Sequence, residues 1–271
     1  MTASEDATLL QLFTRPDRYF ARCGRLCAFI ARHEIGGAPT FMRGLRIAFA
    51  TDFHAIARTS VAHARALADQ INALQADLVL LGGDYADRAE HVAPLFEGLA
   101  AVRAPLGAFG VLGNNDREAW EDPGPLRRLM AGAGFTLLVN ESAKIPLDGG
   151  TLVVAGLDDR LRGEPRLMGL YPEKPSQDAY RVLLFHEPTL VSPAPDLTLS
   201  GHTHGGQFNL LGLTPYSIGF ERLYGRRVRP AAVAGLLDVE GARMLVSKGI
   251  GASRIQLRVG VRPEIDLIRF T

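Results

Sequence analysis

The stretch 45-LRIAFATDFH-54 carries the pattern that decides the fold. An apolar run at residues 45–51 leads directly into Asp52 and His54. The same order returns at 77-DLVLLGGDYAD-87 and at 108-AFGVLGNND-116. Short apolar runs that end in glycine and polar residues are typical of buried strands in a parallel sheet. The three segments therefore predict three strands, each followed at once by polar side chains.

Helix-like segments follow these strands. They cover residues 60–74, 89–102 and 118–133, and the first of them is rich in alanine. Strand, loop and helix thus alternate three times, which favours βαβ units and a largely parallel sheet. Open α/β sheets place their functional sites just past the carboxyl ends of the strands, which is where the polar residues fall.

The second half of the chain is richer in strands. Strands are predicted at residues 136–139, 151–157, 181–185 and 197–200, with a final meander of 235–239, 243–246 and 265–270. No repeat, low-complexity tract or linker interrupts the chain, so residues 41–271 are predicted to form one domain. Two packed sheets with helices outside would accommodate this many strands.

Residues 1–40 are predicted to form an amphipathic helical extension, with the helix itself over residues 9–33. Apolar side chains and arginines repeat there on two different faces: Phe20, Cys23, Cys27 and Ile30 on one, Arg15, Arg18, Arg22 and Arg25 on the other. One interpretation is a helix that packs on the domain with its arginines in water. The other is a basic surface helix that contacts an anionic membrane.

The composition of the chain excludes some classes of protein and favours others. Among 271 residues, the formal net charge is +1, so the chain lacks the basic excess of a general nucleic-acid binder. Its two cysteines, Cys23 and Cys27, have poor disulfide spacing on one helix, which favours a reducing compartment. No apolar run reaches 18 residues, and the N-terminus is acidic, so neither a membrane span nor a signal peptide is expected. The predicted location is the cytoplasm, with the inner membrane surface as an alternative.

Five short motifs carry the chemistry, and each follows a predicted strand. They are D-F-H at 52–54, G-D-Y-A-D at 83–87, G-N-N-D at 113–116, the histidine of 183-LLFHEP-188, and G-H-T-H at 201–204. Imidazole and carboxylate groups bind borderline divalent metals such as Zn²⁺, Mn²⁺ and Fe²⁺. Seven ligands are too many for one open catalytic ion but suit two ions that share a carboxylate. The candidate ligands are Asp52, His54, Asp84, Asn114, His186, His202 and His204.

This ordered series resembles the calcineurin-like metallophosphoesterase superfamily over residues 45–207. The ending 247-SKGIGASRIQLRVGVRPEI-265 resembles a bacterial branch of phosphodiesterase-like, often membrane-associated proteins. The resemblance implies an α/β fold, a four-layer αββα sandwich of two mixed β-sheets flanked by helices. It also implies one ion at Asp52, His54 and His204, a second at Asn114, His186 and His202, and Asp84 as the bridge.

The implied chemistry is hydrolysis by two ions about 3.5–4 Å apart, with a metal-bridging hydroxide attacking phosphorus. His54 and Asn115 are the candidate catalytic residues, and Asp87 and Asp116 are expected to orient ligands through hydrogen bonds. Many family members have histidine at the position of Asn115. Asparagine donates a hydrogen bond but is not a general acid near neutral pH. This departure favours a diester or pyrophosphate with a good leaving group.

The substrate is expected to be a phosphoester, either a small molecule or a lipid-linked one. Arg222, Arg226 and Arg227 form a basic cluster that is either a solvated loop or a wall that grips phosphate. The leading hypothesis is a phosphodiesterase that uses two Mn, Fe or Zn ions. The alternatives are a pyrophosphatase of a nucleotide-linked lipid precursor such as UDP-diacylglucosamine, and a non-catalytic metal-binding scaffold. The near-neutral charge argues against a nuclease or other nucleic-acid partner.

Overall fold

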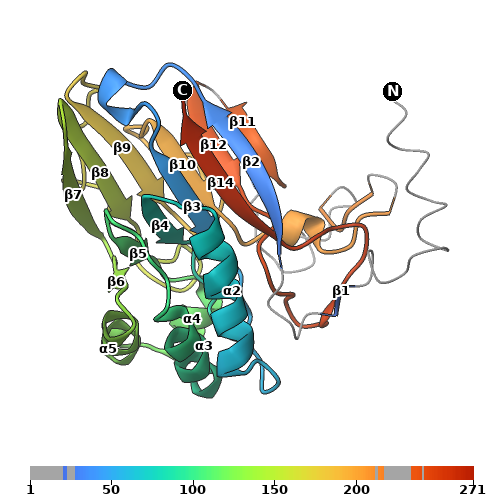
Figure 1. Cartoon of the computed structure of the whole chain (residues 1–271). Helices are drawn as coiled ribbons and strands as arrows, with labels where there is room; N and C mark the ends of the chain where they lie inside the picture. The colour runs from blue at the N-terminus through green and yellow to red at the C-terminus, as the bar shows by residue number, and fades with distance from the viewer. Residues whose placement is uncertain (1–20, 23–27, 211–212, 217–232, 240) are drawn as a thin grey trace.

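Two six-stranded sheets pack face to face in the computed structural model, which describes residues 21–22, 28–210, 213–216, 233–239 and 241–271 (Figure 1). Sheet I has the strand order β2-β14-β3-β4-β5-β6, and sheet II has the order β11-β12-β10-β9-β8-β7. Buried side chains of both sheets, among them Phe49, Leu80, Val182 and Leu199, fill the space between them. The predicted class, two mixed sheets with flanking helices, is confirmed.

The βαβ half of sheet I has the predicted strands, but two helices, at residues 114–119 and 124–132, replace the single helix predicted over residues 118–133. Its parallel strands are β3 (Arg46–Ala50), β4 (Leu78–Leu81), β5 (Ala108–Gly110) and β6 (Thr136–Leu137). The helices are α2 (Val61–Ala73), α3 (Val92–Leu99), α4 (Asn114–Ala119) and α5 (Gly124–Gly132), with short 3-10 turns at Thr40–Met42 and Ala89–His91. Within the described part of the chain, no helix is both long enough and apolar enough to cross a bilayer.

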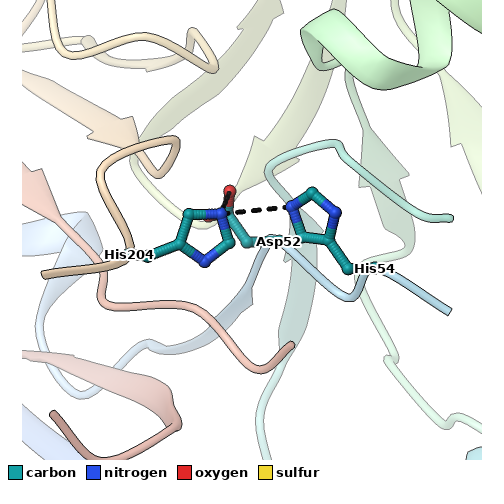
Figure 2. Close-up of side chains that lie close together, drawn as sticks. All are labelled: Asp52, His54 and His204. Carbon is teal, nitrogen blue, oxygen red and sulfur yellow. Dashed lines mark hydrogen bonds and ion pairs between the residues drawn. The ribbon is translucent and has the colours of Figure 1, made fainter. Parts of the chain in front are cut away.

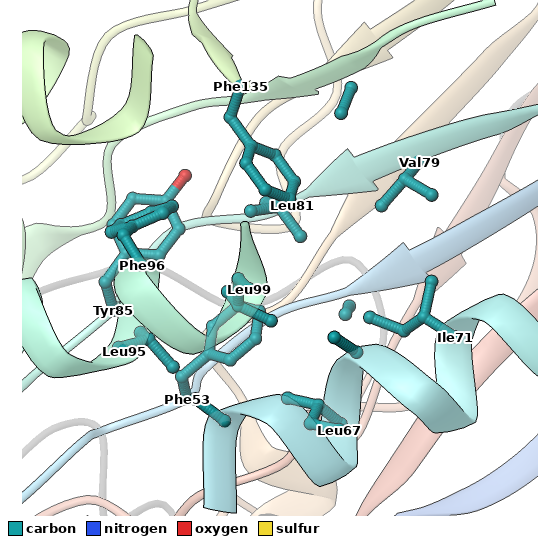
Figure 3. Close-up of a cluster of buried hydrophobic side chains, with 14 of the residues drawn as sticks. Phe53, Leu67, Ile71, Val79, Leu81, Tyr85, Leu95, Phe96, Leu99 and Phe135 are labelled. Atoms are coloured by element: carbon teal, nitrogen blue, oxygen red, sulfur yellow. The ribbon is translucent and has the colours of Figure 1, made fainter. Parts of the chain in front are cut away.

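A second core lies between sheet I and its helices (Figure 3). Strand β4 shows why its sequence is apolar throughout. Val79 and Leu81 face the helices and contact the cluster of Leu67, Ile71 and Phe96, while Leu78 and Leu80 face sheet II. A strand buried on both faces has no need for polar alternation.

Sheet II is mixed. Strands β8 (Gly150–Gly156), β9 (Ala179–Leu184), β10 (Leu197–Ser200) and β12 (Ala242–Val246) run parallel, and β7 (Glu141–Leu147) and β11 (Gly235–Val239) lie antiparallel at its two edges. Its outer face is packed by Leu170 and Tyr171 from the long connection between β8 and β9.

The predicted final meander is wrong. Strands β11 and β12 do pair, but β14 (Glu264–Phe270) crosses to sheet I and lies between β2 and β3. The crossing segment is fixed on the way, because the backbone N–H of Ile250 donates to the carbonyl of Thr51. There β14 hydrogen-bonds on both sides, parallel to β2 and antiparallel to β3.

The predicted helix over residues 9–33 is wrong where the structure describes it. Phe29–Ile35 forms strand β2, which pairs with β14 at seven positions, and Ala21–Arg22 forms β1, which pairs with β13 (Leu257–Arg258). Strand β2 is the edge strand of sheet I and pairs with β14 along its whole length, so this sheet begins ahead of the predicted domain boundary at residue 40. Arg15, Arg18, Arg25 and both cysteines of the predicted helix lie outside the described residues.

Candidate metal centre

The seven predicted ligands come from the carboxyl ends of strands in both sheets. Sheet I supplies Asp52 and His54 after β3, Asp84 after β4, and Asn114 at the start of α4 after β5. Sheet II supplies His186 after β9, and His202 and His204 after β10. The facing edges of the two sheets therefore meet at one cluster of side chains.

The first group consists of Asp52, His54 and His204 (Figure 2). All three are buried. The Nε2 atoms of the two histidines lie 3.1 Å apart, and His204 Nε2 lies 3.4 Å from Asp52 Oδ1. Two imidazole nitrogens and a carboxylate oxygen that converge in this way are suited to share a cation.

The second group adds His186 and Asp84 to Asp52. His186 Nε2 is buried, forms no hydrogen bond, and lies 3.4 Å from Asp84 Oδ2 and 4.0 Å from Asp52 Oδ1. Its Nδ1 lies 2.7 Å from the carbonyl oxygen of Gly82, to which it donates. The ring therefore presents the lone pair of Nε2 toward two carboxylates. An unpaired buried nitrogen so placed fits a divalent metal ion.

Asp84 occupies the position between the two groups. Its Oδ2 atom lies 3.4 Å from the Nε2 of His54 and 3.4 Å from the Nε2 of His186. The backbone N–H of Asn115 donates to the other oxygen, Oδ1, at 2.9 Å. One carboxylate oxygen thus faces a histidine of each group, as a bridging ligand requires.

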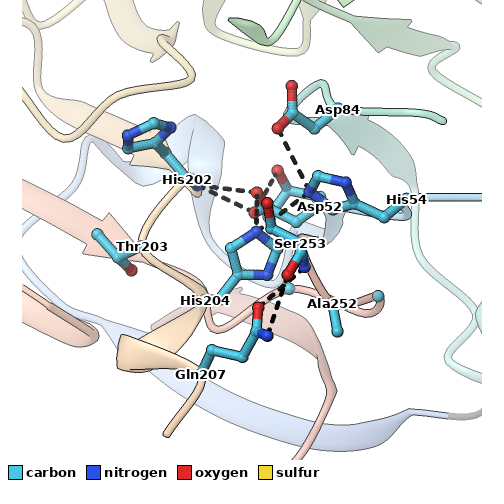
Figure 4. A network of polar contacts seen from close by, with 12 residues as sticks. Asp52, His54, Asp84, His202, Thr203, His204, Gln207, Ala252 and Ser253 are labelled. Atoms are coloured by element: carbon cyan, nitrogen blue, oxygen red, sulfur yellow. Dashed lines mark hydrogen bonds and ion pairs between the residues drawn. The ribbon is translucent and has the colours of Figure 1, made fainter. Parts of the chain in front are cut away.

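Asn114 and His202 also meet at the centre. Asn114 Oδ1 lies 2.9 Å from His202 Nδ1. The backbone N–H of His202 donates to both oxygens of Asp52, at 3.1 and 3.0 Å (Figure 4). These contacts bring the sixth and seventh predicted ligands beside the other five.

Asp87 and Asp116 form hydrogen bonds with groups around the centre. Asp87 Oδ1 lies 2.6 Å from His54 Nδ1, so this nitrogen donates to Asp87 and Nε2 is turned toward the centre. Asp116 accepts hydrogen bonds from the backbone N–H groups of Asp84, Tyr85 and Gly113. Asn115 Nδ2 lies 3.2 Å from His54 Nδ1, which places the candidate catalytic amide at the rim of the first group.

Most of the predicted ligands have left-handed backbone conformations. The φ angles are 53° for Asp52, 43° for His54, 54° for Asp84, 67° for His202 and 53° for His204. Asp and His tolerate this region better than most residues, at a cost of about 1 kcal/mol or more each. Such turns aim consecutive side chains inward, and clustering of this strain is typical of functional sites.

The pKa values of the buried groups are shifted by the opposite and like charges that surround them in the centre. Burial lowers the pKa of His54, but Asp84 and Asp87 outweigh burial and raise it to about 10. Burial raises the pKa of Asp84, but His186 and His54 outweigh burial and hold it well below its ordinary value. Burial together with His54 and Arg258 lowers the pKa of His204 well below its ordinary value.

Arg258 is a residue of the centre to which the sequence analysis gave no role. It is fully buried, and its Nη1 donates to the carbonyl of His204 at 3.3 Å while Nη2 lies 3.1 Å from His204 Nδ1. Its Nε donates to the carbonyl of Gly251. The sequence does contain a sign of this role, which is an arginine inside the apolar run 257-LRV-259. A guanidinium group that is buried with such a run requires polar partners.

The predicted substrate-binding arginines Arg222, Arg226 and Arg227 lie outside the described residues, so their role stays a prediction. Other arginines near the centre form surface contacts. Arg160 donates to Thr189 Oγ1 and Arg162 pairs with Glu118.

Comparison with known proteins shows that the candidate ligands lie in a region that matches a protein family. The model of the calcineurin-like phosphoesterase family matches residues 45–206, which contain all seven predicted ligands. The uncharacterized metallophosphoesterase YkuE of Bacillus subtilis is 30% identical over 73% of this chain and 68% of its own. For YkoQ of the same organism the identity is 29%, over 70% of each chain. The phosphodiesterase YaeI of Escherichia coli is 28% identical over 71% of this chain and 69% of its own.

Proposed function

The chain belongs to the calcineurin-like phosphoesterase family, a family of hydrolases acting on phosphoric esters, and we propose that it is a phosphodiesterase with two metal ions. The position of Asp84 carries the proposal, because one of its oxygens lies 3.4 Å from the Nε2 of both His54 and His186. This contact joins the two ligand groups into one dinuclear centre. A non-catalytic scaffold would have no need for two ligand groups that share a carboxylate.

In this assignment Asp52, His54 and His204 hold one ion, and Asn114, His186 and His202 hold the other. Asp84 bridges them. The imidazole and oxygen donors suit Mn, Fe or Zn. Two ions bound there would polarise the phosphoryl group and activate a water molecule for attack on phosphorus.

The side chains around the ligands set which substrates can react. Asp87 keeps the Nε2 lone pair of His54 directed inward. Asn115 can donate a hydrogen bond to a phosphoryl or leaving-group oxygen, but its amide cannot release a proton near neutral pH. The leaving group must therefore depart as a stable anion, which supports a diester with an acidic leaving alcohol.

A substrate series tests this proposal. With Mn²⁺ added, we expect hydrolysis of bis(p-nitrophenyl) phosphate, with kcat/KM falling steeply as the pKa of the leaving alcohol rises. Asp84→Ala should lower kcat by at least about a hundredfold, since the shared ligand is lost. The exposed Asp69→Ala serves as the matched control and should retain activity. Full activity in Asp84→Ala, or purified protein that binds no metal, would show the proposal to be wrong.

The pyrophosphatase of a nucleotide-linked lipid remains a second candidate because exposed aliphatic side chains lie on two loops, one of which follows His204. Gln207 Nε2 donates to the carbonyls of Ser253 and Ile255, which joins the loop after His204 to the loop at 253–255 (Figure 4). On these loops Leu210, Leu213 and Ile255 are 56%, 63% and 59% exposed. Exposed aliphatic groups beside a centre suit an acyl chain.

The two candidate functions predict different kinetic effects when these aliphatic side chains are removed. For a lipid-linked substrate such as UDP-diacylglucosamine, Leu210→Ser with Ile255→Ser should raise KM several-fold. The same variant should hydrolyse bis(p-nitrophenyl) phosphate as the wild type does. Failure to cleave the lipid-linked compound at all would exclude this candidate and leave the phosphodiesterase proposal standing.

A further inference from the structure

A basic hollow lies on sheet I away from the metal centre. Its lining residues are Arg32, His33 and Glu34 of β2, Gly44 and Arg46 at the start of β3, and Leu267 and Arg269 of β14, around a volume of about 450 Å³. We propose that this hollow is a second anion site, which binds a phosphomonoester dianion. The inference stands on these residues alone and does not depend on the reaction at the metals.

Strand register places the three arginines on one face. Leu267 pairs with Arg32, and Arg269 pairs with Glu34 on one side and with Arg46 on the other. Directly paired residues of neighbouring strands point to the same side of a sheet. This is the helix-bearing side, because Leu267 packs against the cluster that includes Leu67 of α2. In Figure 1 the helices gather at the opposite end of the sheet from the carboxyl ends of β2 and β14.

The charges in the hollow are not balanced. Among the described residues, no hydrogen bond or ion pair within 4 Å engages the guanidinium groups of Arg32, Arg46 or Arg269. Glu34 is the single carboxylate in the lining, and His33 is held by Asp266 at 2.7 Å. Three guanidinium groups against one carboxylate leave a formal surplus of two positive charges, which matches a dianion.

The chemistry of the lining selects phosphate. Guanidinium groups bind phosphoryl oxygens in bidentate pairs, and several of them can surround one tetrahedral anion. Gly44 contributes no side chain, so the anion can approach the backbone there. The hollow is separate from the metals, because Arg46 begins β3 and Asp52 follows its end, with roughly 15–20 Å of extended chain between them.

Titration of inorganic phosphate into the zinc-loaded protein tests the proposal. Calorimetry should show a binding event that is weakened at least about tenfold in Arg46→Gln with Arg269→Gln, since each lost charged hydrogen bond is worth roughly a factor of ten. The Nε–H signals of Arg32, Arg46 and Arg269 in NMR spectra should shift as phosphate is added. The exposed pair Arg103→Gln with Arg128→Gln removes the same charge elsewhere and should leave binding unchanged.

Three further measurements make the result decisive. Glu34→Gln should tighten phosphate binding several-fold, an effect that damage to the fold would not produce. Hydrolysis of bis(p-nitrophenyl) phosphate by the arginine variant should match the wild type. Binding to lipid vesicles distinguishes the possible sources of the anion. Binding to vesicles that contain phosphatidic acid, without binding to free phosphate, assigns a lipid headgroup. Equal binding to phosphatidylserine vesicles, or arginine signals and affinity that stay unchanged with both inorganic phosphate and phosphatidic acid, would overturn the proposal.

Discussion

His54 shows how one side chain divides its two nitrogens between structure and metal. Nδ1 donates to Asp87, while Nε2 faces His204 and Asp84. In the absence of metal, the neighbouring carboxylates keep this imidazole protonated, with a pKa of about 10 against an ordinary 6.5. A metal ion must displace the proton from Nε2 before this nitrogen can bind the ion.

Metal binding is therefore expected to release protons near neutral pH. Because His54 is protonated below pH 10 in the metal-free protein, metal affinity should rise as pH increases from about 6.5 towards 10. Calorimetry in buffers of different ionisation enthalpy measures the number of protons released. Asp87→Asn removes one cause of the raised pKa, so that variant should release fewer protons at about pH 9, close to the wild-type pKa. An equal count in both proteins would contradict the role given to Asp87.

Gly113 is a position where one methyl group should disable the centre. A Cβ there would collide with the carboxylate and backbone nitrogen of Asp84. Gly113→Ala is expected to displace the bridging ligand and lower kcat by at least about a hundredfold. Gly132→Ala is the matched control, because a Cβ at Gly132 meets nothing within 4 Å and its φ is not positive. Kinetics and metal content of both variants check this, and an active Gly113→Ala protein would refute it.

The clustering of the candidate ligands could be predicted from the sequence, while their backbone conformation could not. Asp52, Asp84 and His186 each follow an apolar strand, and strand ends meet at one edge of a sheet. The left-handed backbone at these positions depends on hydrogen bonds between distant segments, such as Asp52 N–H to the carbonyl of Gly83. The role of Arg258 was missed because it acts on His204 from 54 residues away.

At the scale of elements, helix α4 is held against the loop after β8. Arg117 Nε and Nη2 donate to the two oxygens of Asp158 at 2.7 and 2.6 Å. Asp158 also accepts from the backbone N–H groups of Asp159 and Glu164. Since α4 begins at Asn114, this pair positions one ligand and the neighbouring Asn115.

Breaking this pair should lower both stability and metal binding. Arg117→Gln leaves the buried Asp158 carboxylate without its cation, at a cost on the order of 2 kcal/mol, less than for a fully buried pair because Arg117 is partly exposed. Denaturant unfolding checks the stability, and metal titration should show a weaker second ion. Arg65→Gln removes an exposed pair with Asp69 and should change stability by less than about 0.5 kcal/mol.

The pH dependence of this effect has a definite sign. Burial raises the pKa of Asp158, but Arg117 and the backbone donors outweigh burial and lower it below the ordinary 3.8. The pair therefore stabilises the protein fully above about pH 4, and the stabilisation is lost as pH falls through the lowered pKa. The difference between wild type and Arg117→Gln should shrink below pH 4. A difference that grows there would contradict the assignment.

Elements with strong apolar runs were predictable, and those on sheet edges were not. Strand β4 is apolar throughout and was identified. Strand β7, which carries Lys144 and Pro146 at an edge, gave no such signal. Strand β2 was mistaken for a helix end because the spacing of Phe20, Cys23, Cys27 and Ile30 fits a helix, whereas pairing with β14 decides its structure.

At the scale of the whole molecule, the metal centre joins the two sheets. Asp52 and Asp84 come from sheet I, and His186 and His204 come from sheet II. Ions that bind both sets would stabilise the face-to-face packing as well as the site. Ligands that bind only the folded state raise its stability in proportion to the logarithm of their concentration.

Mn²⁺ is therefore expected to raise the melting temperature. At a concentration a hundred times Kd, each ion should add about 2.7 kcal/mol, which for a domain of this size corresponds to roughly 5–10 °C. Differential scanning calorimetry with and without a chelator measures the shift. Asp84→Ala should show a much smaller shift. A shift of the same size in that variant would mean that Mn²⁺ stabilises the protein elsewhere.

The place of β14 bears on how the chain folds during translation. Strands β2 and β3 leave the ribosome early, yet the strand that lies between them follows every other described element. At ordinary rates of synthesis, roughly ten to forty seconds pass between Ala50 and Glu264. During that interval one edge of β3 lacks its partner, and a nascent chain in this state is a natural client for a chaperone that shields unpaired strands.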